Sequence, residues 1–302
     1  MKLEPSILQL LTKFQQKSPS FIVGGYLRDL TAGITPNDID IATEMSIDEV
    51  KKTFPQLSGT EKGLAFGVGR FNYNHWTIEI STYGPNGFRP SVPVRDFTMN
   101  SLFHDGTTLY DEHGAVEDIK RKIIRPLDSP SHHFIEKPEA FLRALRLSSH
   151  LGFSLSDDLI VFMLQNKDLF YKSTVNRLQM EGYKIIQGAH PLKAFRYLSE
   201  LHFLSIPSEF DEDLEIPHLT DHLHIRFAYL ASLIGVQAVY DFIDLFQLSK
   251  RMKEKIHYLS PYFDDTKKVE NPYIINEVIL LKRYQYHQNP EKLKEYLMNL
   301  RK

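Results

Sequence analysis

The chain has 302 residues, of which 42% are hydrophobic, and a formal net charge of -2. This length predicts a globular protein of two or more domains, and the charge excludes nucleic-acid binding through the average field of the protein, so any such contact needs a local patch. The absence of cysteine excludes disulfides and thiolate metal sites. No stretch approaches the roughly 18 uncharged apolar residues of a membrane helix, and the first residues do not build a signal-peptide core. We therefore expect a cytoplasmic protein with no membrane contact.

The first 130 residues alternate between strand and helix patterns. The sequence FIVGGYLRDL (21–30) predicts a strand, a glycine turn and the start of a helix, and NDIDIAT (37–43) predicts a short strand. IDEVKKTF (47–54) predicts a helix, and residues 66–82 predict two alternating strands joined by a turn that contains asparagine. Together these segments indicate an α+β unit.

From about Pro138 the apolar spacing becomes helical nearly to the end of the chain. PEAFLRALRLSSHLG (138–152), for example, starts with proline, stops at glycine and places its apolar side chains toward one side. The acidic segment 207–221 is a plausible boundary within this helical part. We predict three parts: a head at 1–130, a helical neck at 131–205 and a helical body at 206–302.

Asp38 and Asp40 are the first candidates for chemistry. Residues i and i+2 of a strand point the same way, so the two carboxylates share one face. Two adjacent like charges are costly unless a cation lies between them, and Mg²⁺ with oxygen ligands is the expected occupant. Gly24 and Gly25 would let backbone N–H groups approach a phosphate chain, and Arg28 could neutralise it. This combination suits nucleotidyl transfer.

The order and spacing of these motifs resemble a known family. VGGYLRD followed by NDIDIAT is similar to the signature of the class II tRNA nucleotidyltransferases, which include bacterial CCA-adding enzymes and poly(A) polymerases, within the DNA polymerase β-like superfamily. Residues 63–82, 94–105, 109–127 and 141–153 also resemble the segments that follow in this family. The resemblance implies an α+β fold, with a polymerase β-like head built on a five-stranded mixed sheet and all-helical neck and body domains after it.

The resemblance also implies a set of site residues and a reaction. The reaction is Mg²⁺-dependent transfer of NMP from a nucleoside triphosphate, CTP or ATP, to the 3′ hydroxyl of tRNA or another RNA, with release of pyrophosphate. The implied site comprises Asp38 and Asp40 as catalytic metal ligands, Glu79 as a further catalytic carboxylate, and Gly24, Gly25, Arg28, Arg95, Asp96, Asn100, Lys137, Arg143 and Arg146 as nucleotide-binding residues.

The base-reading motif of the family departs from its pattern here. The family motif Glu-Asp-x-x-Arg falls on residues 136–140, where Lys137 replaces the aspartate and Ala140 replaces the arginine. The first change turns an acceptor into a cationic donor, and the second removes a forked donor. Sites that read polar edges discriminate strongly, so we expect altered base specificity. A one-residue shift could instead place Glu139 and Arg143 in these roles, four residues apart on one helix face.

Two further departures favour a second hypothesis. Val94 stands where the family has the first arginine of an Arg-Arg-Asp motif, and the sequence ends at Lys302, where Bacillus-type enzymes continue into a tail that grips the tRNA elbow. The alternative is therefore a repurposed nucleotidyltransferase that modifies a small molecule, peptide or protein. A nonenzymatic relic is disfavoured, because two juxtaposed carboxylates reduce stability when no cation is present.

Other polar and aromatic segments are interpreted as structural. His218 and His222 have the i,i+4 spacing of a helical zinc pair, but no glutamate stands in an H-E-x-x-H arrangement. The aromatic-rich segment 271–290, which includes Lys282 and Arg283, could stack RNA bases. Core packing with a basic rim is the favoured interpretation.

Overall fold

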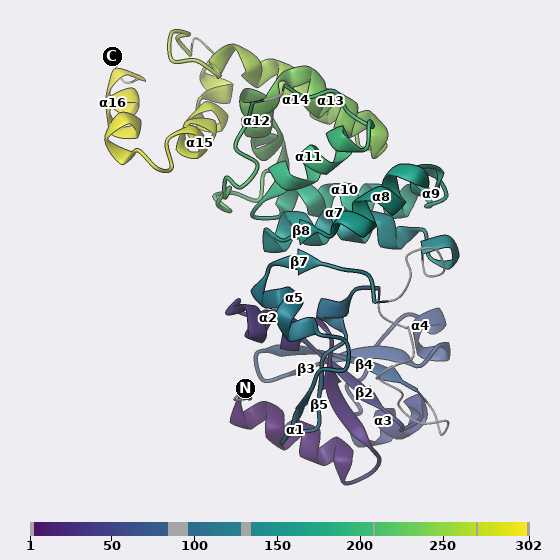
Figure 1. Cartoon of the computed structure of the whole chain (residues 1–302). Coiled ribbons are helices and arrows are strands. Elements are labelled where there is room, and N and C mark those ends of the chain that lie inside the picture. The colour runs from purple at the N-terminus through teal and green to yellow at the C-terminus, as the bar shows by residue number, and fades with distance from the viewer. Residues whose placement is uncertain (1–2, 84–95, 128–133, 208, 270, 301–302) are drawn as a thin grey trace. The chain divides into compact units, whose positions relative to one another are not determined.

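The computed structural model describes residues 3–83, 96–127, 134–207, 209–269 and 271–300. The chain forms two compact units, Met1–His133 and Phe134–Lys302 (Figure 1). A mixed sheet with helices forms the first unit, and helices dominate the second, which confirms the predicted α+β fold class. The further division of the helical part at residue 205 stays a prediction.

The first unit is built on a six-stranded sheet in the order β3-β4-β2-β1-β5-β6. β2 and β4 are parallel, and the other neighbours are antiparallel. The elements of this unit are α1 (Pro5–Gln15), β1 (Ser20–Val23), α2 (Gly25–Ala32), β2 (Asp38–Thr43), α3 (Ile47–Thr53), α4 (Glu61–Ala65), β3 (Val68–Tyr73), β4 (Trp76–Thr82), η1 (Thr98–Asn100), β5 (Phe103–His104), β6 (Leu109–Tyr110), α5 (Ala115–Lys120) and β7 (Ile123–Ile124).

The expectation of five strands is wrong by one, because a tight turn adds β6 at the edge of the sheet. The Asp105 carboxylate accepts the backbone N–H groups of Thr107 at 2.8 Å and Thr108 at 2.7 Å. This aspartate-centred turn folds the chain back, so that Phe103 pairs with Tyr110. Their rings stack with centroids 4.6 Å apart.

The two faces of the sheet differ in polarity around β2, β4 and β3. Ile39 and Ile78 are fully buried on one face, which also carries Phe71. There Phe54, after α3, stacks between Phe14 of α1 and Phe71 of β3, with ring centroids 4.5 and 4.9 Å away. The alternating residues on these three strands are mostly polar and face the other way. This second face is called the open face below.

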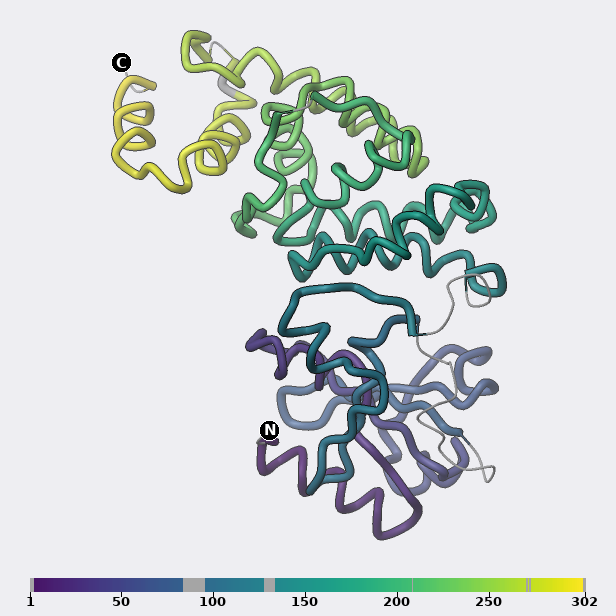
Figure 2. Tube along the Cα trace, in the orientation of Figure 1, coloured from purple at the N-terminus to yellow at the C-terminus, as the bar shows by residue number. Residues whose placement is uncertain are grey.

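The second unit is helical, as its sequence periodicity predicts. α7 packs against α10 and α11, and α12 packs against α13, α14 and α15; the trace in Figure 2 follows both groups. Gly152 ends α7 in the left-handed conformation with φ 68°. The elements are α7 (Glu139–Leu151), β8 (Ser154–Leu155), α8 (Asp157–Gln165), α9 (Asp168–Tyr171), α10 (Val175–Gln187), α11 (Pro191–Glu200), α12 (Leu223–Ile234), α13 (Val236–Leu245), α14 (Arg251–Leu259), η2 (Ser260–Tyr262), η3 (Pro272–Ile274), α15 (Ile275–Gln285) and α16 (Pro290–Leu300).

A buried arginine fastens α12 to the segments around it. Arg226 is 1% exposed and donates hydrogen bonds to the backbone carbonyls of Ile186, Gly188, Ile216 and Pro217. These carbonyls lie at the end of α10 and before α12, where a helix or sheet ladder does not satisfy them. In the described ranges, no helix has both the length and the apolar character needed to cross a membrane.

Candidate active site

The carboxylate pair lies at the start of β2. Asp38 is exposed and Asp40 is half-buried, whereas Ile39 between them is buried on the opposite face of the sheet. This alternation places both carboxylates on the open face. The strand holds them there because Ile39 and Ile41 anchor its other side in the core.

Strand pairing places a third carboxylate beside the first two. In the parallel pair of β2 and β4, Asp40 is the register partner of Glu79, and Asp38 is that of Thr77. Directly opposite residues on neighbouring strands have their side chains on the same face. Glu79 is exposed and therefore joins the two aspartates on the open face.

The glycine corner lies next to Asp40 on its other side. β1 pairs with β2 so that Val23 is the partner of Asp40, and the chain then turns at Gly24 with φ 72° and ψ -135°. Side chains rarely permit this conformation, so glycine is required. Gly25 begins α2, and its N–H donates to Asp40 Oδ2 at 3.3 Å. A Cβ on Gly25 would lie 3.5 Å from Arg28 Nη2, an ordinary van der Waals contact, so the guanidinium packs directly against this position.

Arg28 connects the glycine corner to a segment 72 residues away. Its Nη1 donates to Asn100 Oδ1 at 2.8 Å, and its Nε donates to Asp29 Oδ1 at 2.7 Å. Asn100 Nδ2 in turn donates to Asp96 Oδ1 at 3.3 Å. Burial raises the pKa of Asp29, and the charge of Arg28 opposes that shift. The guanidinium is therefore held in one orientation beside the corner, with 14% of its side chain exposed.

A second polar network holds the turn that carries Asn100. Thr98 N–H donates to the Arg125 carbonyl at 2.9 Å, and Arg125 Nε donates to Asp118 Oδ2 at 3.0 Å. Asp111 accepts the N–H of Ala115 at 2.7 Å at the start of α5. The segment 109–127 thus supports the site without contributing to it directly. Its role could not be assigned from the sequence, which showed only that it resembled the family.

The predicted nucleotide-binding residues fall in three places. Gly24, Gly25, Arg28, Asp96 and Asn100 are linked in the first unit as described above. Arg95 lies outside the described residues, as does Val94. Lys137, Arg143 and Arg146 belong to the second unit and are considered separately.

In the second unit, α7 carries both predicted arginines, and Lys137 is exposed just before this helix. Arg146 Nε lies 2.7 Å from Oε2 of Glu181, whose other oxygen is 3.0 Å from Arg177 Nη2. Arg146 therefore has a structural role in addition to the nucleotide contact that stays a prediction. Ala140 is 1% exposed and packs in the core of the unit.

The donor set on the open face fits a hard divalent cation. Among the described residues, no group of three or more His, Asp or Glu side chains could enclose a metal ion. Mg²⁺ does not need such a cage, because it retains waters and is usually held by one or two carboxylates together with substrate phosphates. Asp38 and Asp40 supply that number of carboxylates beside the Arg28 guanidinium, a donor suited to phosphate. The Gly24 N–H donates to the Leu102 carbonyl at 3.2 Å, and the Gly25 N–H donates to Asp40.

The residues of the candidate site lie in a region that matches a known protein family. Residues 20–87, which contain the glycine corner, the carboxylate pair and Glu79, match the poly A polymerase head domain. The first unit therefore contains a segment similar to the poly A polymerase head domain. The predicted resemblance to the class II nucleotidyltransferases is confirmed.

Curated relatives extend the similarity into the second unit. The CCA-adding enzyme of Geobacillus sp. (strain WCH70) is 28% identical over 264 residues, covering 78% of this chain and 64% of that protein. The CCA-adding enzyme of Geobacillus stearothermophilus is 32% identical over 196 residues, covering 60% and 48%. That of Staphylococcus epidermidis (strain ATCC 12228 / FDA PCI 1200) is 30% identical, covering 82% and 65%. The chain thus spans about half to two thirds of these relatives.

Solved structures share the fold of the whole chain. The Bacillus stearothermophilus CCA-adding enzyme in complex with CTP has a TM-score of 0.76 at 22% identity, covering 99% of this chain and 82% of that one. The Thermotoga maritima CCA-adding enzyme complexed with tRNA has a TM-score of 0.65 at 22% identity, covering 99% and 84%.

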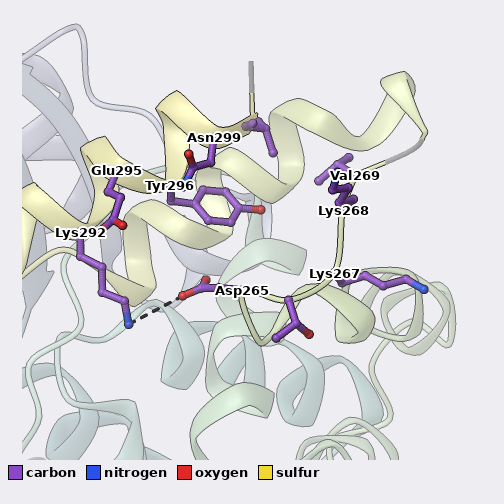
Figure 3. A pocket seen from close by; sticks show the side chains of 10 residues that line it. Asp265, Lys267, Lys268, Val269, Lys292, Glu295, Tyr296 and Asn299 are labelled. Carbon is purple, nitrogen blue, oxygen red and sulfur yellow. Dashed lines mark ion pairs between the residues drawn. The ribbon is translucent and has the colours of Figure 1, made fainter. Parts of the chain in front are cut away.

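A hollow of about 470 Å³ lies in the second unit, and its lining residues do not resemble those of the candidate active site. It lies between α16 and residues 265–269, and Lys292 faces Asp265 across it at 3.7 Å (Figure 3). Lys282 is fully buried and donates to Asp265 Oδ1 at 2.8 Å. The interpretation of Lys282 as part of a basic rim is therefore wrong, because Asp265 neutralises its charge inside the fold. Arg283 alone of that pair is exposed.

Histidines before and within the first turn of α12 make side-chain contacts. His224 Nε2 lies 2.8 Å from Glu277 Oε1, and burial lowers the pKa of this imidazole. His218 Nε2 lies 3.1 Å from Asp221 Oδ1 on the surface. The His224 contact joins α12 to α15, whereas the His218 contact lies within the segment before α12.

Proposed function

We propose that the chain is a Mg²⁺-dependent nucleotidyltransferase that transfers NMP from a nucleoside triphosphate to the 3′ hydroxyl of tRNA or another RNA and releases pyrophosphate. The single observation that carries the proposal is the row of Asp38, Asp40 and Glu79 on one open face beside the glycine corner. The relatives named CCA-adding enzymes support the reaction class, and the solved complexes with CTP, ATP and tRNA support the substrates. We expect the activity in the cytoplasm.

Different residues of the first unit bind Mg²⁺ and bind and orient the triphosphate. Asp38 and Asp40 would hold Mg²⁺, which supplies Lewis-acid stabilisation of negative charge on the phosphate oxygens. Gly24 and Gly25 let the triphosphate approach the backbone closely, and the guanidinium of Arg28 binds it. Catalysis of this kind is mostly positioning and electrostatic stabilisation, so a fixed guanidinium is worth more than a mobile one.

Asp96 and Asn100 orient the triphosphate contact. Asn100 accepts from Arg28 at 2.8 Å and donates to Asp96 at 3.3 Å, so its amide links the guanidinium to the carboxylate. We assign Arg95 and Asp96 to ribose and triphosphate contacts, and Glu79 to the acceptor side of the carboxylate row.

Base selection is altered relative to the relatives in this proposal. Lys137 replaces an acceptor by an exposed cation, and Ala140 provides no polar group at a position that is 1% exposed. CTP and ATP remain the expected donors, with Arg143 and Arg146 near the base. The same two changes favour the second candidate, a nucleotidyltransferase that modifies a small molecule, peptide or protein.

Labelled nucleotides test the proposal and separate the two candidates. The protein is incubated with each α-labelled NTP, Mg²⁺ and either tRNA lacking its 3′ end or a small-molecule extract. We expect label on the RNA and loss of pyrophosphate release in Asp40→Ala, whereas Asp48→Ala, an exposed aspartate on α3, serves as the matched control. Label on a small molecule alone would favour the second candidate, and full turnover by Asp40→Ala would remove the metal assignment.

A further inference from the structure

The open face continues past Glu79 onto β3, where it carries a cation. In the antiparallel pair of β3 and β4, Arg70 is the register partner of Glu79, which is itself the partner of Asp40. Asp40, Glu79 and Arg70 therefore form one row across three adjacent strands. The residues that β2, β4 and β3 present on this face include three carboxylates and a single cation, Arg70.

The backbone of Arg70 is fixed, but its side chain is available. Arg70 N–H donates to the Ser58 carbonyl and Ser58 N–H donates to the Arg70 carbonyl, both at 2.8 Å. The side chain is exposed, and within the described residues its guanidinium makes no hydrogen bond or ion pair. A forked donor on a rigid strand that has no protein partner is suited to an external anion.

Arg70 also borders two hollows in the surface of the first unit. One, of about 530 Å³, is lined by Ser58, Thr60, Glu79 and glycines, so part of its wall is bare backbone. The other, of about 420 Å³, is lined by Gln56, Asn72 and Thr77. Arg70 and Ser58 line both hollows, and hydroxyl and amide groups surround Arg70 on both sides.

The in-line geometry of phosphoryl displacement indicates that the acceptor substrate lies on the Arg70 side of the site. The glycine corner lies on the β1 side of Asp40, and Arg70 lies on the β3 side, two strand spacings or about 10 Å from Asp40 between Cα atoms. In-line displacement at a phosphorus places the attacking oxygen opposite the leaving pyrophosphate. A triphosphate held at the corner therefore requires the acceptor to approach across β4 and β3.

We propose that Arg70 binds a backbone phosphate near the 3′ end of the RNA acceptor. The inference rests on the proposed function and adds an acceptor subsite to it. Three carboxylates on this face would repel a polyanion, so a cation on the acceptor side compensates for part of that repulsion. The bidentate geometry of arginine matches two phosphate oxygens, and the hollows on either side leave space for the adjoining sugars.

RNA acceptors of altered charge test the assignment. Arg70→Ala, Arg70→Lys and the control Lys51→Ala, an exposed lysine on α3, are compared on an RNA acceptor with all phosphates or with one neutral methylphosphonate at each of the last three linkages. Arg70→Ala is expected to raise the RNA KM about tenfold, leave the NTP KM unchanged and reduce the salt slope of RNA binding by about 1. Arg70→Lys should recover part of the affinity, and Lys51→Ala should match the unchanged protein.

The methylphosphonate series locates the contact. One neutral linkage should weaken RNA binding to the unchanged protein by a similar factor and have no further effect on Arg70→Ala. Independent, multiplicative losses at all three linkages would overturn the inference, as would an unchanged RNA KM and Kd in Arg70→Ala with normal thermal unfolding.

RNA binding measured by fluorescence anisotropy separates this inference from the proposed function. RNA that binds with the expected Arg70 dependence but receives no NMP would support the subsite and contradict the proposed reaction. RNA that receives NMP equally well from Arg70→Ala would contradict the subsite alone. Arg70-dependent transfer to a non-RNA acceptor, without RNA binding, would overturn both assignments.

Discussion

Replacing Glu181 with glutamine should destabilise the helical unit by about 3 kcal/mol. The Glu181 side chain is 1% exposed, with its oxygens 2.7 Å from Arg146 Nε and 3.0 Å from Arg177 Nη2. Breaking a buried ion pair by removing one partner costs about 3–5 kcal/mol. Arg146 and Arg177 are 21% and 33% exposed, so water can partly solvate them after the change, which places the effect at the low end of this range.

The two units can be followed separately in a urea titration of the full chain. The single tryptophan, Trp76, lies on β4, so its fluorescence reports on the first unit, whereas far-UV circular dichroism reports mainly on the helices. Glu181→Gln should lower the dichroism midpoint and leave the fluorescence midpoint unchanged. Arg177→Gln removes only the more exposed partner and should cost about 1 kcal/mol.

A decrease in the free energy of unfolding of less than about 1 kcal/mol in Glu181→Gln would refute the reasoning. The carboxylate would then not stabilise the two partly buried guanidinium groups of Arg146 and Arg177. If Arg146 also binds the nucleotide, the same substitution should raise the NTP KM, since Glu181 fixes the orientation of its guanidinium. An unchanged NTP KM alongside the stability loss would assign Arg146 a structural role only.

Gly24→Ala should destabilise the first unit by about 1–3 kcal/mol and raise the NTP KM, because φ 72° and ψ -135° strain any side chain; the Trp76 fluorescence midpoint checks it. Burial lowers the pKa of His104, whose Nδ1 accepts the Gly106 N–H at 2.9 Å. As the pH falls below about 6.5, the unfolded state binds a proton at His104 at a higher pH than the folded state does, so the free energy of unfolding should decrease. His104→Gln should flatten this pH dependence of stability. Lys137→Asp with Ala140→Arg should change the ratio of kcat/KM for CTP and ATP. The double substitution should also lower the free energy of unfolding by about 1–3 kcal/mol, because Ala140 is buried. An unchanged ratio would mean that these positions do not read the base.

The sequence was most informative where a function depends on local geometry. Asp38 and Asp40 share a face because successive side chains of a strand point to opposite faces. This follows from their spacing of two residues in the sequence. The helix 139–151 and its stop at Gly152 follow from apolar spacing and a glycine that can adopt positive φ. These features require no knowledge of what lies across the fold.

The sequence was least informative about distant partners. Lys282 stands beside Arg283 in a tyrosine-rich segment, so an exposed rim was a reasonable prediction, yet Asp265 from another segment allows Lys282 to be buried. Likewise, nothing near Glu181 in the sequence shows that Arg146 reaches it from α7. Charged residues can be buried only when paired, and the partner is selected by packing.

For the candidate active site, the chain alone determined the residue types: an acidic pair in one strand, a glycine corner and an arginine one turn into a helix. Only the tertiary structure decided that Glu79 and Arg70 continue the row begun by Asp40, and that Asn100 orients Arg28 from 72 residues away. The physical reason is that side-chain alternation is a property of a single strand. Strand register and loop placement depend instead on the sum of many weak long-range contacts.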